Sequence, residues 1–192
     1  MSDDAVRKGR IKLVLLGTVL SLPVVAAYLL YFFGPPVDGT VNYGDLLEPV
    51  ALPDPELRLL DGRGFRLSDL KGRWVMLQAG AGACDEGCRA RLYAMRQVRK
   101  IQGKEMHRIE RVWLVTDGSE PDAALLSDYE GTWVVTGGAR TILEALPAAD
   151  AAVEHIFIID PLGNLMLRFP RNADPNRMKK DVGRLLKVSR IG

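Results

Sequence analysis

Residues 74–88 read WVMLQAGAGACDEGC, an apolar run followed by small residues and then by two cysteines. The apolar part, 74–78, has the length and composition of a short buried strand. Residues 89–102 follow with apolar side chains at helical spacing, namely Leu92, Met95, Val98 and Ile101. The segment therefore predicts a strand, a flexible loop and a helix, with the cysteines at the start of the helix.

The flanking segments alternate between strand and helix patterns. Upstream, two short strands surround Asp61-Gly-Arg-Gly64, which is a hairpin signal. The expected strands are 57–60, 65–67, 109–115, 132–135, 155–160 and 165–169, and the expected helices are 121–129, 139–146 and 175–188. This order predicts a central mixed sheet with helices on both faces. A cysteine pair directly after a strand is typical of the thioredoxin-like α/β fold.

One apolar segment sets the organisation of the 192-residue chain. The 21 residues from Leu13 to Phe33 carry no charge, and at about 1.5 Å per residue they form a helix of roughly 32 Å, enough to cross a bilayer. The aromatic end, Tyr28–Phe33, favours a retained anchor over a cleaved signal peptide. We expect a cytoplasmic N-terminus over 1–12, a transmembrane helix over 13–33, a linker over 34–53 and a thioredoxin-like domain over 54–192.

The formal net charge of +2 lies entirely at the N-terminus. Residues 1–12 hold four basic and two acidic residues, and the remainder holds 22 of each. Basic residues before a span predict that this end stays in the cytoplasm. We therefore expect a single-pass protein of the bacterial inner membrane with a periplasmic C-terminal domain. The neutral domain lacks the basic excess of a nucleic-acid-binding protein, so nucleic acid is excluded as a partner.

The two cysteines, Cys84 and Cys88, are the strongest candidate site residues. A helix start favours the thiolate form, and a spacing of four places the Cα atoms about 6 Å apart, within reach of a disulfide. A bridge that closes so short a loop stabilises a fold little, so a purely structural role is disfavoured. Two soft thiolates suit Cu(I), with zinc as an alternative that needs more protein ligands.

The two histidines have different settings. His155 opens the apolar strand 155–160, where a thioredoxin-like fold brings the chain close to the cysteine loop. It is either a third ligand or a structural histidine, and the sequence pattern leaves both open. His107 lies in a polar turn and is expected at the surface.

Charged residues near the cysteines also allow two interpretations. Asp85 and Glu86 fit the helix dipole at an N-terminus, and they could also attract a cation. A basic cluster follows on the helix and either docks an acidic partner or forms a solvated face. Its members are Arg89, Arg91, Arg96, Arg99, Lys100 and Lys104.

Three segments together resemble the Sco/SenC family. They are 71–77 (KGRWVML), the Cys84-x-x-x-Cys88 motif and 153–164 (VEHIFIIDPLGN). The resemblance covers roughly residues 53–188 and extends to the anchor. It implies a membrane-anchored, thioredoxin-fold copper protein that helps to assemble the copper centre of cytochrome c oxidase. It further implies Cys84, Cys88 and His155 as copper ligands, with Cu(I) the first choice and Cu(II) the second.

The chain also departs from that family's pattern. The cysteine loop lacks the prolines that usually follow each cysteine. The segment before it, 78–83, consists mostly of small residues. Residues 117–122 (DGSEPD) replace the family's Asp-Pro-x-x-Asp-Thr stretch. These departures indicate a divergent member.

The leading hypothesis is a copper-binding assembly factor, not an enzyme, that delivers Cu(I) to cytochrome c oxidase or matures its copper centre. Its partner would be an oxidase subunit or another assembly protein. The alternative is a thiol–disulfide oxidoreductase without a cofactor that reduces the copper-binding cysteines of an oxidase subunit. In it, Cys84, expected to be the more exposed sulfur, attacks and Cys88 resolves. A further alternative is a non-metal docking module in oxidase biogenesis.

Overall fold

The computed structural model describes residues 3–34, 42–147 and 149–189. The chain divides into two compact units, Met1–Thr40 and Val41–Gly192. The first contains the helix α1, Asp3–Phe33. Its part from Arg7 to Phe33 is long and apolar enough to cross a membrane. The predicted span, 13–33, lies within it, and we treat α1 as a candidate membrane anchor.

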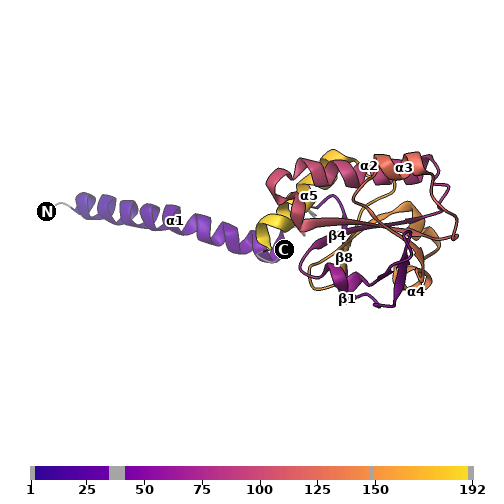
Figure 1. Ribbon diagram of the computed structural model, residues 1–192. Coiled ribbons are helices and arrows are strands. Elements are labelled where there is room, and N and C mark those ends of the chain that lie inside the picture. Colours follow the sequence, from indigo (N-terminus) through magenta and orange to yellow (C-terminus); the bar gives the residue numbers. More distant parts are fainter. Residues whose placement is uncertain (1–2, 35–41, 148, 190–192) are drawn as a thin grey trace. The chain divides into compact units, whose positions relative to one another are not determined.

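In the described part of the second unit, eight strands form one mixed sheet in the order β1-β8-β7-β4-β5-β6-β2-β3 (Figure 1). The strands are β1 Asp45–Ala51, β2 Leu57–Leu59, β3 Gly64–Phe65, β4 Trp74–Gly80, β5 Ile109–Val115, β6 Trp133–Gly137, β7 Ile156–Ile159 and β8 Asn164–Arg168. β4, β5 and β6 run parallel, and the other neighbours pair antiparallel. The predicted mixed sheet is confirmed.

Helices cover both faces of the sheet. The helices are α2 Glu86–Ile101, α3 Ala123–Asp128, α4 Arg140–Ala145 and α5 Pro175–Val188, and the 3₁₀ turns are η1 Leu67–Leu70, η2 Gly103–Arg108 and η3 Ala149–Glu154. Figure 1 shows α2, α3 and α5 on one side of the sheet and α4 on the other. Successive β4 residues point to opposite layers: Met76 packs with Met95 and Met178, and Leu77 packs with Ile142 and Phe157.

The segment expected to be a linker, 34–53, contains a strand. β1 pairs antiparallel with β8, from Asp45 opposite Arg168 to Ala51 opposite Asn164. It is an edge strand with mostly exposed residues, so its sequence carries no alternation of apolar and polar side chains. The domain therefore begins before residue 54, and the first part of the expected linker, 35–41, lies outside the described residues.

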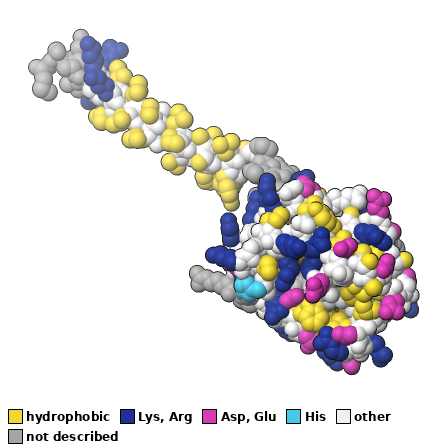
Figure 2. All heavy atoms as spheres, turned by 45° about the horizontal axis from the view of Figure 1, so that its top comes forward, with side chains coloured by type: hydrophobic (Ala, Val, Ile, Leu, Met, Phe, Trp, Pro, Cys, Tyr) yellow, Lys and Arg dark blue, Asp and Glu magenta, His cyan; other side chains and the backbone are white. Residues whose placement is uncertain are grey.

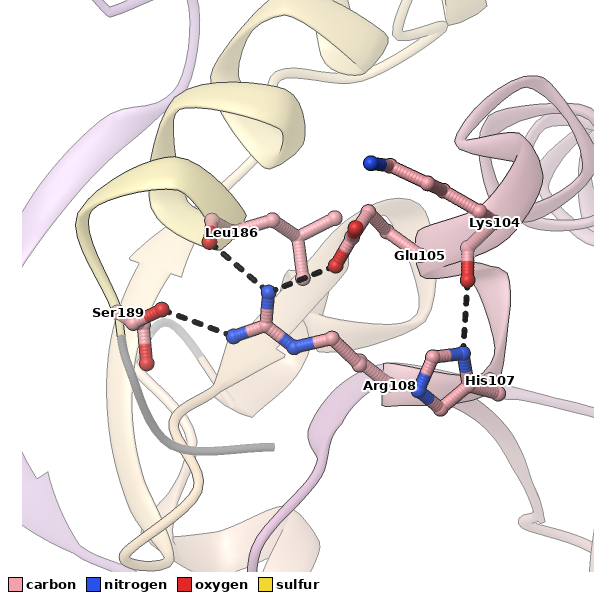
Figure 3. A network of polar contacts seen from close by, with 6 residues as sticks. All are labelled: Lys104, Glu105, His107, Arg108, Leu186 and Ser189. Carbon is pink, nitrogen blue, oxygen red and sulfur yellow. Dashed lines mark hydrogen bonds and ion pairs between the residues drawn. The ribbon is translucent and has the colours of Figure 1, made fainter.

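Two buried charged side chains fix the segments near the start and the end of this unit through hydrogen bonds to the backbone. Asp181 of α5 is 2% exposed, and its carboxylate accepts the N–H groups of Tyr43 and Gly44 at 2.7 and 2.9 Å. Arg108 donates to the carbonyl oxygens of Leu186 at 3.0 Å and of Ser189 at 2.9 Å (Figure 3). A cation at the last carbonyls of a helix is favourable, so Arg108 fixes the end of α5.

Candidate functional site

The cysteine pair lies where β4 passes into α2. β4 ends at Gly80, a short loop follows, and Asp85 caps α2 by accepting the N–H of Cys88 at 2.7 Å. Such a cap satisfies a backbone donor that the helix cannot. Cys84 and Cys88 form a disulfide with a Cα–Cα distance of 5.1 Å. The predicted strand, loop and helix start are thus present, and the cysteines are within disulfide reach as expected.

Both cysteines are buried. Cys84 and Cys88 are each 1% exposed, and they pack with apolar side chains that include Leu92, Trp113 and Leu125. The expectation that Cys84 is the more exposed of the two is therefore wrong for the oxidised form, because the loop turns Cys84 inward. A partner thiol can reach either sulfur only if this loop moves.

The loop before Cys84 alternates in exposure. Ala81 and Ala83 are exposed, whereas Gly82 and Cys84 are buried. Cys84 has a φ of 45°, in the left-handed region that residues other than glycine rarely adopt. A Cβ atom on Gly82 would lie 2.2 Å from the carbonyl oxygen of Ser119. The closed loop thus requires a glycine at 82 and an uncommon backbone conformation at 84.

Asp117, at the end of the neighbouring strand β5, ties this loop down. Its carboxylate accepts the N–H of Gly82 at 3.0 Å and the hydroxyl of Ser119 at 2.8 Å. These hydrogen bonds, that from Gly82 first, hold the pKa of Asp117 below its usual value of 3.8. The loop is therefore held by an ionised carboxylate at neutral pH.

A buried amide lies beside the second sulfur. Gln78, 0% exposed, receives a hydrogen bond on its Oε1 from Arg91 Nε at 3.2 Å. Because a guanidinium only donates, the amide oxygen must face Arg91, and the amide nitrogen faces Cys88 Sγ at 3.7 Å. Burial lowers the pKa of Arg91, while Asp85 and Glu154 oppose that shift. Gln78 thus presents a fixed N–H donor to the sulfur.

A second N–H group lies near the same sulfur. Trp113 Nε1 is buried and has no hydrogen-bond partner within the described part of the chain. A Cβ atom built on Gly80 would lie 3.4 Å from Cys88 Sγ and 3.7 Å from Trp113 Nε1. Sequence reasoning missed these donors. Gln78 could have been found, because it is the polar residue within an otherwise apolar strand.

The histidines differ as predicted. His107 is exposed, with Nδ1 2.8 Å from the carbonyl oxygen of Lys104 (Figure 3). His155 is half-buried before β7, and its Nδ1 lies 2.7 Å from the carbonyl oxygen of Phe169. Because a carbonyl only accepts, Nδ1 of His155 carries the proton, and in the neutral ring Nε2 keeps its lone pair.

The predicted copper ligands do not form one group here. Over residues 3–34, 42–147 and 149–189, no three side chains of the His, Cys, Asp and Glu types gather as they would around a metal ion. Cys84 and Cys88 are together but bonded to each other, and His155 does not join them. The oxidised arrangement therefore does not fit copper, and a site with all three residues stays a prediction for the reduced protein.

The family model for the transmembrane-like, thioredoxin-like, C-terminal domain matches residues 74–189, more than half of the chain. That match starts at β4 and includes both cysteines and His155. Among curated proteins, none matches this sequence.

Solved structures with the same fold include Sco1 proteins and a thiol:disulfide interchange protein. Yeast Sco1 with copper bound has a TM-score of 0.60 at 15% identity, covering 74% of this chain and 96% of that one. Apo Sco1 from Thermus thermophilus scores 0.59 at 19%, covering 75% and 96%. A thioredoxin-family thiol:disulfide interchange protein from Chlorobium tepidum scores 0.58 at 19%, covering 73% and 98%. At these identities the likeness shows the thioredoxin-like fold alone.

Proposed function

The chain belongs to the transmembrane-like, thioredoxin-like C-terminal domain family, and from this premise we propose that it is a membrane-anchored thiol–disulfide oxidoreductase whose redox pair is Cys84 and Cys88. The observation that carries the proposal is the Cys84–Cys88 disulfide at the start of α2, with the Gln78 amide N–H 3.7 Å from Cys88 Sγ. Hydrogen bonding stabilises a thiolate more than a disulfide sulfur. The surroundings of Cys88 thus favour release of a thiolate when the bridge opens.

The two cysteines take different parts in the exchange. In the reducing direction, the Cys84 thiolate attacks one sulfur of a partner disulfide, so that a mixed disulfide forms and one partner thiolate leaves. The Cys88 thiolate then attacks Cys84 Sγ, and the second partner thiolate leaves with the electron pair. The two thiol protons pass to the partner through solvent. An external dithiol returns the chain to its reduced form by the reverse steps.

Cys84 is assigned as the attacking residue because of the segment that carries it. The loop before Cys84 consists of small residues and is exposed in part. Once the hydrogen bond from Gly82 to Asp117 breaks, the loop can open without disturbing the sheet. Cys88, in contrast, lies inside α2 and bonds through its N–H to Asp85. An opening of the loop therefore exposes the Cys84 sulfur first.

The partner is a protein disulfide close to the membrane. We propose that α1 anchors the chain in the bacterial inner membrane, with the N-terminus in the cytoplasm and the domain in the periplasm, as the N-terminal charges predict. Periplasmic cysteines are prone to oxidation. The copper-binding cysteines of an oxidase subunit are one such substrate, and that is the partner we propose.

The experiment uses the full chain in micelles of an uncharged detergent, with a peptide that carries one intramolecular disulfide as the substrate. The reduced wild type should convert the peptide to its dithiol, and Cys88→Ser should accumulate a mixed disulfide at Cys84 that mass spectrometry detects. Cys84→Ser should do neither. If the wild type leaves the peptide oxidised, or if Cys84→Ser reduces it at the wild-type rate, the proposal is wrong.

Copper delivery is the second candidate, and one feature of His155 favours it. Its Nδ1 bond to Phe169 leaves Nε2 available to a metal, which is the usual arrangement of a ligating histidine, and yeast Sco1 was solved with copper. Reduced Cys84 and Cys88 with His155 would then hold Cu(I) as cargo. An anaerobic Cu(I) titration against a chelator, repeated with His155→Ala, tests this: one-to-one binding lost in the variant supports it. Undiminished binding in the variant excludes His155 as a ligand.

A further inference from the structure

We propose that a cavity between α2, α3 and β5 binds a phosphate group. The cavity has a volume of about 350 Å³, and its basic lining residues are Arg96, Arg99, Lys100 and Arg111. Figure 2 shows basic side chains gathered on the side of the domain that carries α2. This site is separate from the disulfide, and it does not rest on the proposed redox function.

Arg111 is the central observation, because its guanidinium is buried without full pairing. The side chain lies on β5 and is 3% exposed. Its Nη2 donates to the carbonyl oxygen of Glu130 at 2.6 Å. Its Nε and Nη1 are buried and, across the described ranges of the chain, have no hydrogen-bond partner. A buried donor without an acceptor is costly, so an acceptor that enters the cavity and reaches these two N–H groups would stabilise the fold.

Basic side chains also outnumber acidic ones around Arg111, since four basic and two acidic residues line the cavity. Burial first, and then the nearby Arg99 and Arg96, lower the pKa of Arg111 to about 10. Glu110 opposes that shift, but it pairs with Arg73. In the described part of the molecule, none of the four basic lining residues forms an ion pair within 4.0 Å. An anion in the cavity would remove this repulsion.

Capping of α3 explains only part of the cluster. Arg96 donates to the carbonyl oxygen of Asp128 at 2.5 Å, at the end of that helix, where a cation is favourable. That role uses Arg96 Nη1 and Arg111 Nη2. Arg96 also stacks over the ring of Tyr129, but its buried Nε has no hydrogen-bond partner among the residues described. Arg99 is held next to β5 by a hydrogen bond from its Nε to the carbonyl oxygen of Ile109 at 2.7 Å, and this bond does not use its terminal nitrogens. The remaining donors therefore indicate a ligand.

The chemistry of the donors favours a phosphate group over a carboxylate. A carboxylate presents two oxygens in one plane and is matched by one guanidinium. Here three guanidiniums come from two different elements, α2 and β5, and line one cavity, an arrangement that suits an oxyanion with three or four oxygens and two negative charges. The carboxylates of Asp128 and Glu130 also line the cavity and would compete with such a ligand.

The test is calorimetric titration of the full chain, in micelles of an uncharged detergent, with inorganic phosphate at constant ionic strength. We expect saturable binding that Arg99→Gln weakens at least tenfold and that Arg111→Gln abolishes. Asp128→Asn should tighten it severalfold. The matched control is Arg140→Gln, since the Arg140 side chain is 91% exposed and pairs only locally with Glu144. If Arg111→Gln fails to fold, Arg99→Gln alone decides.

Two further arms separate the sources of the phosphate group. Tighter binding of glycerol 3-phosphate than of inorganic phosphate identifies a free phosphomonoester as the ligand. A larger effect of phosphatidic acid mixed into the micelles identifies a lipid headgroup. Either result supports the site. A titration without saturation, an equal response to chloride, or an equal loss in Arg140→Gln overturns it.

Discussion

Gly82→Ala is expected to expose the disulfide while leaving the fold intact. The added Cβ atom would lie 2.2 Å from the carbonyl oxygen of Ser119 and 2.5 Å from its Oγ. The first of these is a backbone atom, so the closed loop has to shift. Overpacking of this kind costs about 2 kcal/mol. If the open loop is free of that contact, the substitution raises its population roughly thirtyfold, because each 1.4 kcal/mol is a factor of ten.

The assay is the rate at which a small reductant opens the Cys84–Cys88 bridge of the full chain. Because both cysteines are only 1% exposed, we expect reduction to pass through the open loop, and Gly82→Ala should be reduced about thirtyfold faster than the wild type. The control is Gly64→Ala, whose Cβ atom would meet only Glu56 Oε1 at 3.5 Å. A rate for Gly82→Ala equal to that of the control would show that the loop does not limit access to the disulfide.

Three other outcomes are expected. Asp181→Asn should lower the free energy of unfolding, measured by urea titration, by about 3 kcal/mol. The reason is that the substitution removes the charge of a buried carboxylate, 2% exposed, that accepts two backbone N–H groups. A change below about 1 kcal/mol would contradict this. Because the pKa of Asp117 is lowered in the folded protein, the hydrogen bond from Gly82 to its carboxylate is fully present above the usual carboxyl pKa and is lost as the pH falls through the lower pKa of the folded state. Reduction of the disulfide by a phosphine should therefore accelerate below about pH 4. Asp117→Asn should remove that acceleration. Gln78→Leu should shift the glutathione equilibrium about tenfold toward the disulfide, because one hydrogen bond to the thiolate contributes about 1.4 kcal/mol; an unchanged equilibrium would remove Gln78 from the site.

The sequence predicted the central elements of the fold well. The strand 109–115 and the helix 175–188 coincide with β5 and α5, because the first contains a short apolar run and the second has apolar residues at helical spacing. β1 was missed for the opposite reason. As an exposed edge strand it has no buried face to impose a pattern, and only its pairing with β8 makes it a strand.

The sequence located the two cysteines correctly but did not reveal their surroundings. The spacing of Cys84 and Cys88 was enough to place them within reach of a disulfide at a helix start, since both residues lie in one local segment. Gln78 and Trp113 come from adjacent strands, and Asp117 reaches Gly82 across the end of β5. Such contacts depend on the register of the sheet, which no spacing along the chain reveals.

Gln78 lies on a central strand, whereas Cys84 follows a surface loop, and these two segments differ in how readily they open. β4 lies between β5 and β7, so we expect its residues to exchange their amide protons only on extensive unfolding. We expect the loop around Ala81 and Ala83, in contrast, to open locally. The Gln78 donor beside Cys88 and the loop before Cys84 therefore lie in segments that we expect to open independently of each other. In the redox function that we propose, substitutions in the loop before Cys84 would change the rate of thiol–disulfide exchange, and substitutions on β4 would change its equilibrium, so that the two properties could evolve independently.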